Sequence, residues 1–173
     1  RGPQVLRAAS TGVSAPRFFV EGMALADGEQ AELPEAAAHH AARVLRLAAG
    51  DEITLFDGSG GEHTATIVRI DKRCVHVEIG RFAAIEREAN AAVTLVMSVI
   101  ATDTMDIAVR RAVELGVARI EPVLAARSQA SARGERAVRR VAHWRQIVQA
   151  ACEQCGRNRV PAVAEIVPIT ERI

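Results

Sequence analysis

One amphipathic stretch, residues 135–155, most constrains how this chain can fold. Its apolar residues recur every three or four positions, which places them on one face of an α-helix. These residues are Val138, Val141, Trp144, Val148, Ala151 or Cys152, and Cys155. Glu135 falls in the expected first turn, where the helix dipole favours an anion, and Gly156 is a suitable stop after the last turn. The fold must therefore bury this helix along one side.

The opposite face of the predicted helix is basic, and more arginines follow the glycine. The basic residues are Arg136, Arg139, Arg140, His143, Arg157 and Arg159. Residues 127–159 hold eight arginines and two glutamates, a balance of +6 in a chain whose net charge is +1. Arginine pairs well with phosphate and stacks on bases. The cluster indicates binding to a nucleic acid, and a solvated basic helix face is the equally open alternative.

The N-terminal half shows the period-two alternation of β-strands. Strands are expected at 17–20, 53–56, 63–70 and 74–79, and one short helix is expected at 36–47, after Pro34. His40, Arg43 and Arg46 share one side of that helix. The glycine-rich loop 57–61 joins two strands, which indicates a hairpin turn rather than a phosphate cradle. The pattern predicts a small closed or half-closed β-barrel of roughly 65 residues.

The pattern changes after residue 91. Apolar strands are expected at 93–100, 117–124 and 160–167, separated by a helix at 104–115 and by the basic helix. Thr102 or Asp103 is the expected cap of the first helix, Leu115 is expected to face inward, and Gly116 is expected to end it. This order predicts a parallel α/β sheet whose first strand is buried on both faces. Three strands leave an unpaired apolar edge, so the sheet looks incomplete.

These changes of pattern divide the chain into four segments. Residues 1–15 are expected to be a disordered tail, 16–82 the barrel, 83–91 a linker and 92–173 the α/β part. The sequence shows neither a signal-peptide pattern nor an apolar run of membrane-spanning length. Its three cysteines lack the pattern of a disulfide framework and fit a reducing compartment. We therefore expect a cytoplasmic protein.

Cys152 and Cys155 form a C-x-x-C motif at the C-terminal end of the basic helix, where the helix dipole opposes ionisation of a thiol. A structural zinc site needs a second pair of ligands, which Cys74 alone does not supply. The adjacent His39 and His40 cannot hold one metal ion across a helical turn. Packing thiols are therefore the favoured interpretation, and no metal site is predicted.

Several segments of the chain share one resemblance. They are PRFF at 16–19, HAARVLR at 40–46, LFDG at 55–58, RAVELGV at 111–117, HWRQ at 143–146 and AACEQCGRNRVP at 150–161. In this order and spacing they resemble the RsmE-type 16S ribosomal RNA uridine-N3 methyltransferases of the SPOUT class. Agreement of several segments in order is more specific than any one of them.

The resemblance implies a PUA-like barrel that engages RNA, followed by an α/β domain whose C-terminal part ties a knot around S-adenosylmethionine. It also implies a homodimer and methyl transfer to N3 of a uridine in the small ribosomal subunit. By the same match, the implied RNA contacts are Arg17, His40, Arg43, Arg46 and Arg127. The residues implied on the RNA or dimer side of the methyltransferase domain are Arg111, Glu114, Glu153, Gln154 and Arg157. From spacing alone, salt bridges on helix surfaces are the favoured interpretation of this second group. No catalytic base is identified.

The chain departs from the family pattern at three places. Thr104 replaces a basic residue, and Ala125 and Ala126 stand where the family commonly has serine and glutamate. The chain ends at Ile173, before the family's Gly-Pro-Glu-Gly-Gly and Leu-Arg-Thr-Glu-Thr segments, which carry the knot and most of the cofactor pocket. Two hypotheses follow: part of a ribosomal RNA methyltransferase whose cofactor site lies beyond Ile173, or an RNA-binding module that acts without the cofactor.

Overall fold

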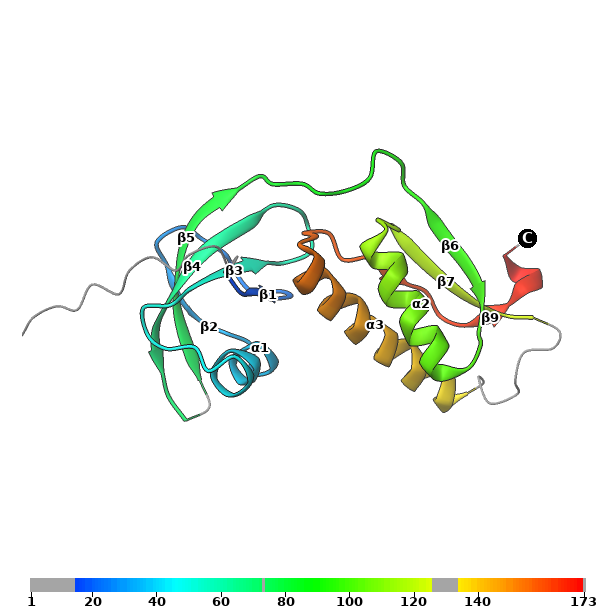
Figure 1. The fold of residues 1–173 in the computed structure, drawn as a ribbon, viewed down its shortest axis with the longest axis horizontal. Helices are drawn as coiled ribbons and strands as arrows, with labels where there is room; N and C mark the ends of the chain where they lie inside the picture. The colour runs from blue at the N-terminus through cyan, green and yellow to red at the C-terminus, as the bar shows by residue number, and fades with distance from the viewer. Residues whose placement is uncertain (1–14, 73, 126–133, 173) are drawn as a thin grey trace, which may run out of the picture.

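The computed structural model describes residues 15–72, 74–125 and 134–172. It has a β-rich N-terminal part and an α/β C-terminal part, joined by an extended linker that runs along one side of the molecule (Figure 1). The expected tail at 1–15 lies almost wholly outside the described residues. Within the described part, no helix is both long enough and apolar enough to cross a membrane.

The N-terminal part is one five-stranded sheet in the order β1-β3-β4-β5-β2. Its strands are β1 Arg17–Phe19, β2 Gln30–Glu32, β3 Glu52–Phe56, β4 Glu62–Ile70 and β5 Val75–Ala83. β1 runs parallel to β3, and the other neighbours are antiparallel. Val75, Val77 and Ile79 are buried, as their alternation predicts. The pattern does not predict β2, because Gln-Ala-Glu carries no alternation and becomes a strand by pairing with β5.

One short helix packs beside this sheet. α1 Glu35–His39 continues into a π-helical turn, η1 His40–Val44, so the helical region ends three residues before the predicted position 47. In the wider turn the amide of Leu45 donates to the carbonyl of His40, five residues back, at 3.0 Å. Arg46 then has a φ of 55°, a left-handed conformation that residues with a Cβ adopt rarely. Both features are enriched at functional sites.

The C-terminal part is a parallel sheet with two helices on one face (Figure 1). Its elements are β6 Thr94–Ser98, α2 Thr102–Glu114, β7 Arg119–Leu124, α3 Glu135–Cys155, β8 Ala162–Val163, β9 Val167–Pro168 and η2 Ile169–Glu171. β6 pairs with one side of β7, while β8 and β9 pair with the other. The predicted parallel α/β order is confirmed, except that the third strand is two short strands.

The core of this part lies between the helices and the sheet. Val141, Trp144 and Val148 of α3 pack there with Met105 and Val109 of α2. Gly156 ends α3 with a φ of 86°, the left-handed conformation typical of a glycine stop.

Three burial predictions for this part are wrong. Val138 is 62% exposed, because it lies in the first turn of α3, ahead of the packed segment. Leu115 is 82% exposed, because α2 ends at Glu114 and the chain turns away at Gly116. Val96 of β6 is 46% exposed, because the helices cover only one face of the sheet. In addition, Ala101 occupies the cap position of α2, and neither Thr102 nor Asp103 caps the helix.

The two parts touch through α3 and the first strands of the sheet. β1 packs against α3, and Phe56 of β3 belongs to the core of the C-terminal part. The glycine-rich loop joins β3 to β4 as predicted, and Gly58 and Ser59 also form β-bridges with Arg159. β5 runs to Ala83, so residues 81–83 belong to the sheet and the linker begins at 84.

We predict that Trp144→Ala lowers the free energy of unfolding by about 3–5 kcal/mol, because it removes a large side chain that is 1% exposed. Val138→Ala on the same helix is the matched control and is expected to change stability by less than about 0.5 kcal/mol. Urea denaturation followed by circular dichroism measures both. Equal effects of the two substitutions would contradict this placement of the core.

Candidate nucleic-acid interface

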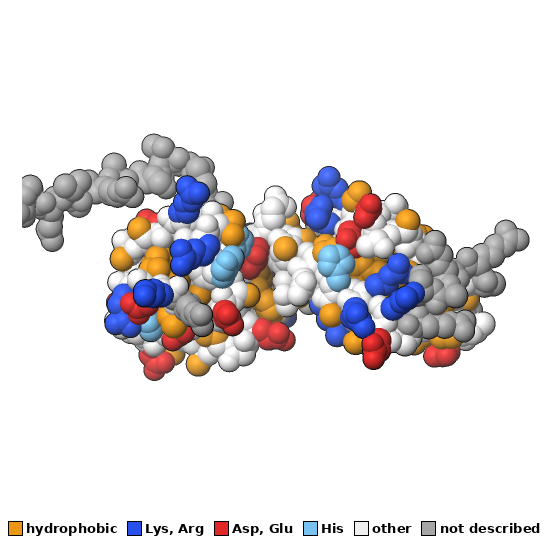
Figure 2. Space-filling model, turned by 90° about the horizontal axis from the view of Figure 1, so that it is seen from below, with side chains coloured by type: hydrophobic (Ala, Val, Ile, Leu, Met, Phe, Trp, Pro, Cys, Tyr) orange, Lys and Arg blue, Asp and Glu red, His pale blue; other side chains and the backbone are white. Residues whose placement is uncertain are grey.

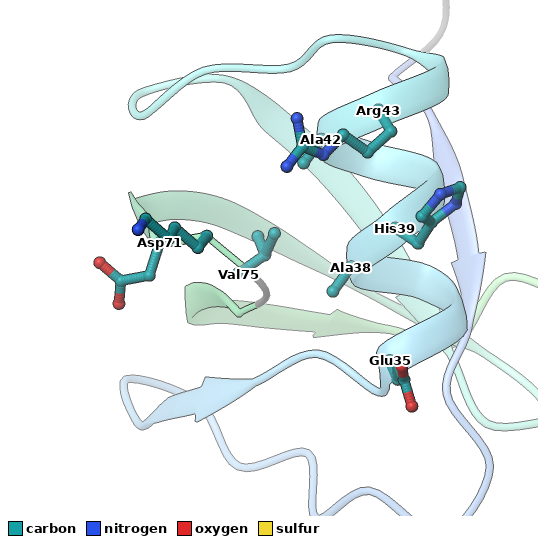
Figure 3. Close-up of a pocket in the computed structure, with 8 residues that line it drawn as sticks. Glu35, Ala38, His39, Ala42, Arg43, Asp71 and Val75 are labelled. Carbon is teal, nitrogen blue, oxygen red and sulfur yellow. The ribbon is translucent and has the colours of Figure 1, made fainter.

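A basic surface lies on the helix of the N-terminal part. His39, Arg43 and Arg46 are exposed there. A depression of about 410 Å³ separates the helix from the β4–β5 turn, and Lys72 and Asp71 line its far side. Figure 3 shows Arg43 reaching across Ala42 toward that turn. The structure thus places Arg43 and Lys72 around one hollow, where the carboxylates of Glu35 and Asp71 also line the wall.

His40 lies apart from this surface. It is half-buried, and its ring stands edge-on to Phe18, with 5.7 Å between the ring centroids. Its charge acts on Glu153 of α3, and the amide of Phe19 donates to the Glu153 carboxylate at 2.9 Å. Burial raises the pKa of Glu153, and the Phe19 amide together with the charges of His40 and Arg17 offsets part of this rise. These residues belong to the contact between the two parts.

A second basic surface lies on the N-terminal half of α3. Arg136 and Arg139 are exposed, Arg140 is half-buried, and His143 pairs with Asp106 of α2 at 2.8 Å. The ion pair of Arg139 with Glu135 is fully at the surface and contributes little to stability. Figure 2 shows basic side chains on both halves of one face of the molecule. The predicted basic face of α3 is therefore confirmed.

A shallow depression of about 580 Å³ runs between α2 and α3. Three of the five predicted polar residues line it: Arg111, Glu114 and Gln154. Arg111 pairs with Glu114 one turn along the helix at 2.5 Å. The structure thus brings these three side chains to one accessible surface, next to His143.

Arg157 does not lie on that surface. It is 4% exposed, pairs with Glu88 of the linker, and donates to the carbonyls of Val113 and Val117 at 2.9 Å each. The guanidinium therefore joins the linker to the end of α2. The donors of this side chain are used inside the protein, and its expected position on the RNA or dimer side stays a prediction.

Arg17, predicted to contact RNA, is also taken up internally. Its side chain is 11% exposed, lies over the ring of Phe56 at 4.9 Å, and pairs with Glu62 at 2.7 Å. It also donates to the side-chain oxygen of Asn158. Its charge is therefore paired at the contact between the two parts, and its predicted RNA contact stays a prediction. Arg127 lies outside the described residues.

Glu62 is the centre of this internal network. Its carboxylate accepts hydrogen bonds from Arg17, from Arg87 at 2.8 Å and from Asn158 at 2.9 Å. Burial alone would raise the pKa of Glu62, but the hydrogen bonds from Arg87, Arg17 and Asn158 outweigh it and lower the pKa to about 2. Glu62 is therefore ionised throughout the neutral range.

The sequence patterns do not reveal Glu62, Arg87, Glu88 or Asn158 as important. Glu62 begins a strand, and residues 84–91 read only as a linker. The alternating charges of Glu86, Arg87 and Glu88 are the one available signal. The two glutamates pair with arginines that follow α3, and Arg87 pairs with Glu62. Each partner is more than 20 residues away in sequence, so periodicity cannot detect the pairs.

The cysteines fit the predicted role of packing thiols. Cys152 is buried, and its burial, with the neighbouring Cys155, raises the pKa of its thiol to about 12. Such a thiol is not ionised at neutral pH and is a poor nucleophile. Among the residues that the structure describes, no three His, Cys, Asp or Glu side chains are grouped to hold a metal ion.

We predict that Glu62→Gln destabilises the protein by about 3 kcal/mol at pH 7. The fold lowers the pKa of Glu62 from 4.5 to about 2, and the variant loses the stabilisation of the ionised carboxylate that this shift represents. A carboxyl group whose pKa is lower in the folded protein stabilises the fold at pH values above its pKa in the unfolded protein. This contribution disappears as the pH falls from about 4.5 to 2. The stability gap between wild type and variant should therefore narrow below pH 4.5 in denaturation at a series of pH values. Glu52→Gln, at an exposed position on the neighbouring strand, is the control. A gap independent of pH would contradict the network.

Two family models match this chain. Residues 87–173 match the RNA methyltransferase domain, and residues 33–80 match the RNA methyltransferase PUA domain. Together they cover both parts of the fold, in the order predicted.

Solved and curated proteins give the same result. The S-adenosyl methionine-bound ribosomal RNA small subunit methyltransferase E of Neisseria gonorrhoeae is 38% identical, with a TM-score of 0.87 over 92% of this chain and 65% of that one. A Legionella pneumophila structure, a putative methyltransferase in complex with the cofactor SAM, is 32% identical, with a TM-score of 0.81 over 90% and 63%. The Bacillus subtilis ribosomal RNA small subunit methyltransferase E is 27% identical over 74% of this chain and 50% of that protein.

The chain spans about half to two thirds of the length of these relatives. The match of its C-terminal half to the methyltransferase domain, with the PUA domain before it, confirms the predicted fold class and the resemblance. The chain therefore belongs to the RNA methyltransferase family that joins a PUA domain to a methyltransferase domain.

Proposed function

We propose that this chain is the RNA-binding portion of a methyltransferase that transfers a methyl group from S-adenosylmethionine to N3 of a uridine in 16S ribosomal RNA. One observation carries the proposal. The Neisseria gonorrhoeae protein, named as a ribosomal RNA small subunit methyltransferase E, matches both parts of this chain in one continuous superposition. The proposed substrate implies that the protein acts in the cytoplasm, where the small ribosomal subunit is assembled.

Within this proposal, residues 16–83 form the RNA-reading domain, 84–91 the linker and 92–173 the beginning of the methyltransferase domain. Arg43 and Arg46 contact phosphates from the N-terminal helix. The N-terminal half of α3 supplies the second basic surface, and Arg127, outside the described residues, is a further proposed RNA contact. His40 lies apart from the exposed arginines, beside Phe18 and Glu153, so its implied RNA contact stays a prediction. These assignments are supported by exposure and charge.

The depression between α2 and α3 is the proposed site of the RNA or of a second subunit. Arg111, Glu114 and Gln154 line it, and the exposed Ile107 and Leu115 lie on or just after the same helix as Arg111. A homodimer is part of the proposal. Glu153 and Arg157 support this surface from inside, through their contacts with Phe19 and with the end of α2.

The chemistry places a definite demand on the site. N3 of a neutral uracil carries a proton, which must leave before or during attack on the methyl group. A base must therefore lie within hydrogen-bond reach of N3, and the two reacting atoms must be held in line. S-adenosylmethionine supplies the activated methyl group when it is bound.

The two depressions beside the proposed RNA contacts do not fit the cofactor. An adenosine ring needs a concave, mostly apolar pocket. The depressions beside α1–η1 and between α2 and α3 are shallow and lined by charged side chains such as Arg43, Lys72 and Arg111. We therefore place the cofactor pocket in the part of the relatives that this chain does not span, and we derive no step through it.

We predict that Arg46→Gly separates RNA binding from folding. Glycine adopts a φ of 55° without strain, so stability should stay equal or rise by up to about 1 kcal/mol. RNA affinity should fall in this variant and in Arg43→Ala. In both, the slope of log affinity against log salt concentration should become shallower by about 0.7–0.9 for each phosphate that the variant no longer neutralises. Fluorescence anisotropy with a 16S ribosomal RNA fragment measures this, and the exposed Arg81→Ala is the control. Unchanged slopes in both variants would remove this helix from the RNA site.

We further predict that the 173-residue chain binds 16S ribosomal RNA in a salt-dependent way but does not bind S-adenosylmethionine in calorimetric titration. One-to-one binding of the cofactor would overturn its placement outside this chain. Failure to bind RNA at low salt would overturn the proposed function. Salt-sensitive RNA binding by a longer form that likewise shows no cofactor dependence would favour the RNA-binding module.

A further inference from the structure

The contact between the two parts is built around one buried carboxylate. Three segments meet β4 at Glu62: β1 through Arg17, the linker through Arg87, and the loop after α3 through Asn158. Asn158 is fully buried and also donates to the carbonyl of Ile85 at 2.7 Å. A single side chain thus holds the N-terminal sheet, the linker and the methyltransferase domain.

This arrangement differs from an ordinary surface salt bridge. The side chains of Arg17 and Glu62 are 11% and 13% exposed, so water screens their charges little. Glu62 faces two guanidinium groups, and its removal leaves both without their shared anion: Arg17 in a largely buried contact, and Arg87, which is 40% exposed, at its edge. Charge-assisted hydrogen bonds with this geometry are strong and directional. They oppose rotation of one part against the other.

A second contact lies beside the first and acts in the same direction. Arg159, after α3, pairs with Glu86 of the linker at 3.0 Å and lies across the glycine-rich loop. A Cβ added at Gly60 would collide with the Glu86 carboxylate and come within 2.6 Å of the Arg159 guanidinium. The loop therefore needs glycine for its φ of 115°, while a Cβ would in addition push aside the exposed ends of Glu86 and Arg159. It is a docking surface as well as a hairpin turn.

The contact sets how the two basic surfaces lie relative to each other. One surface is at the α1–η1 helix and the other on the N-terminal half of α3, and basic side chains are visible on both halves of one side of the molecule (Figure 2). Two weak sites held at a fixed separation bind one RNA more tightly than either does alone, because the second contact forms within the same complex. A loose connection loses part of this gain to the entropy of ordering the domains.

We propose that Glu62 is a positioning residue that locks the N-terminal domain against the methyltransferase domain, so that one RNA is bound by both basic surfaces at once. This inference rests on the proposed function. Glu62 does not touch the RNA. Glu62 acts on the gain in affinity that comes from binding one RNA at both basic surfaces. It also acts on how rigidly the two domains tumble together.

The experiment compares wild type with Glu62→Gln and Glu62→Asp, with Glu52→Gln as the control. Each is titrated with a long structured fragment of 16S ribosomal RNA and with a short oligonucleotide that spans one surface only. Glu62→Gln should weaken binding of the long RNA about tenfold or more and leave the short one unchanged. Glu62→Asp keeps the charge on a shorter side chain and should give an intermediate loss.

NMR relaxation and small-angle X-ray scattering on the same folded variants test the lock without RNA. Separate tumbling of the two domains in Glu62→Gln, against joint tumbling in wild type, supports the proposal. Joint tumbling in both, or an unchanged ratio of long to short RNA affinity, overturns it. If wild type binds neither RNA, the proposed function fails, and the tumbling measurement still decides whether Glu62 locks the domains.

Should Glu62→Gln not fold, Arg159→Ala, at an exposed pair, takes its place with a smaller expected loss.

Discussion

Burial of one face of α3 is the interaction on which the rest of this structure depends. The helix packs against α2, β8 and β1, so it contacts the other helix, its own sheet and the N-terminal domain. Trp144 sits in the middle of this face with almost no exposure. Because the same side of the helix serves all three contacts, the opposite side is left to solvent and keeps its arginines. Burial of the apolar face of α3 thus leaves the arginines of the opposite face exposed.

Two sets of arginines among the described residues lie in contrasting environments. Those at the start of α3 and on the N-terminal helix are exposed or half-buried, and their guanidinium groups are within reach of a polyanion. Arg17 and Arg157 are buried, each beside a glutamate, and further donors of each bond to an amide oxygen or to backbone carbonyls. Burying a guanidinium is costly unless such partners neutralise it and use its donors. The buried arginines therefore serve the architecture, while the exposed ones are free to serve recognition.

The N-terminal helix combines two unusual backbone features at its exposed end. The π-helical turn at His40–Val44 widens the helix, and Arg46 follows in a left-handed conformation. The turn rotates His40 toward Phe18 and leaves Arg43 pointing toward the hollow beside Lys72. Residues three apart on a regular helix would lie on one side, as the spacing predicts. The wider turn separates their roles, one at the domain contact and one at the surface.

Local periodicity by itself determined much of this protein: the amphipathic α3, the alternating strands 75–79, the helix stops at Gly116 and Gly156, and the parallel α/β order. These depend on neighbours along the chain, which a sequence displays directly. Only the tertiary structure decided that Arg17 and Arg157 are internal, that Leu115 and Val138 face solvent, and that Glu62 joins the two domains. The partners involved are far apart, as in the contact between Arg17 and Asn158, which are separated by 141 positions. The role of a charged side chain is set by which distant groups the fold brings to it, and periodicity carries no information about that.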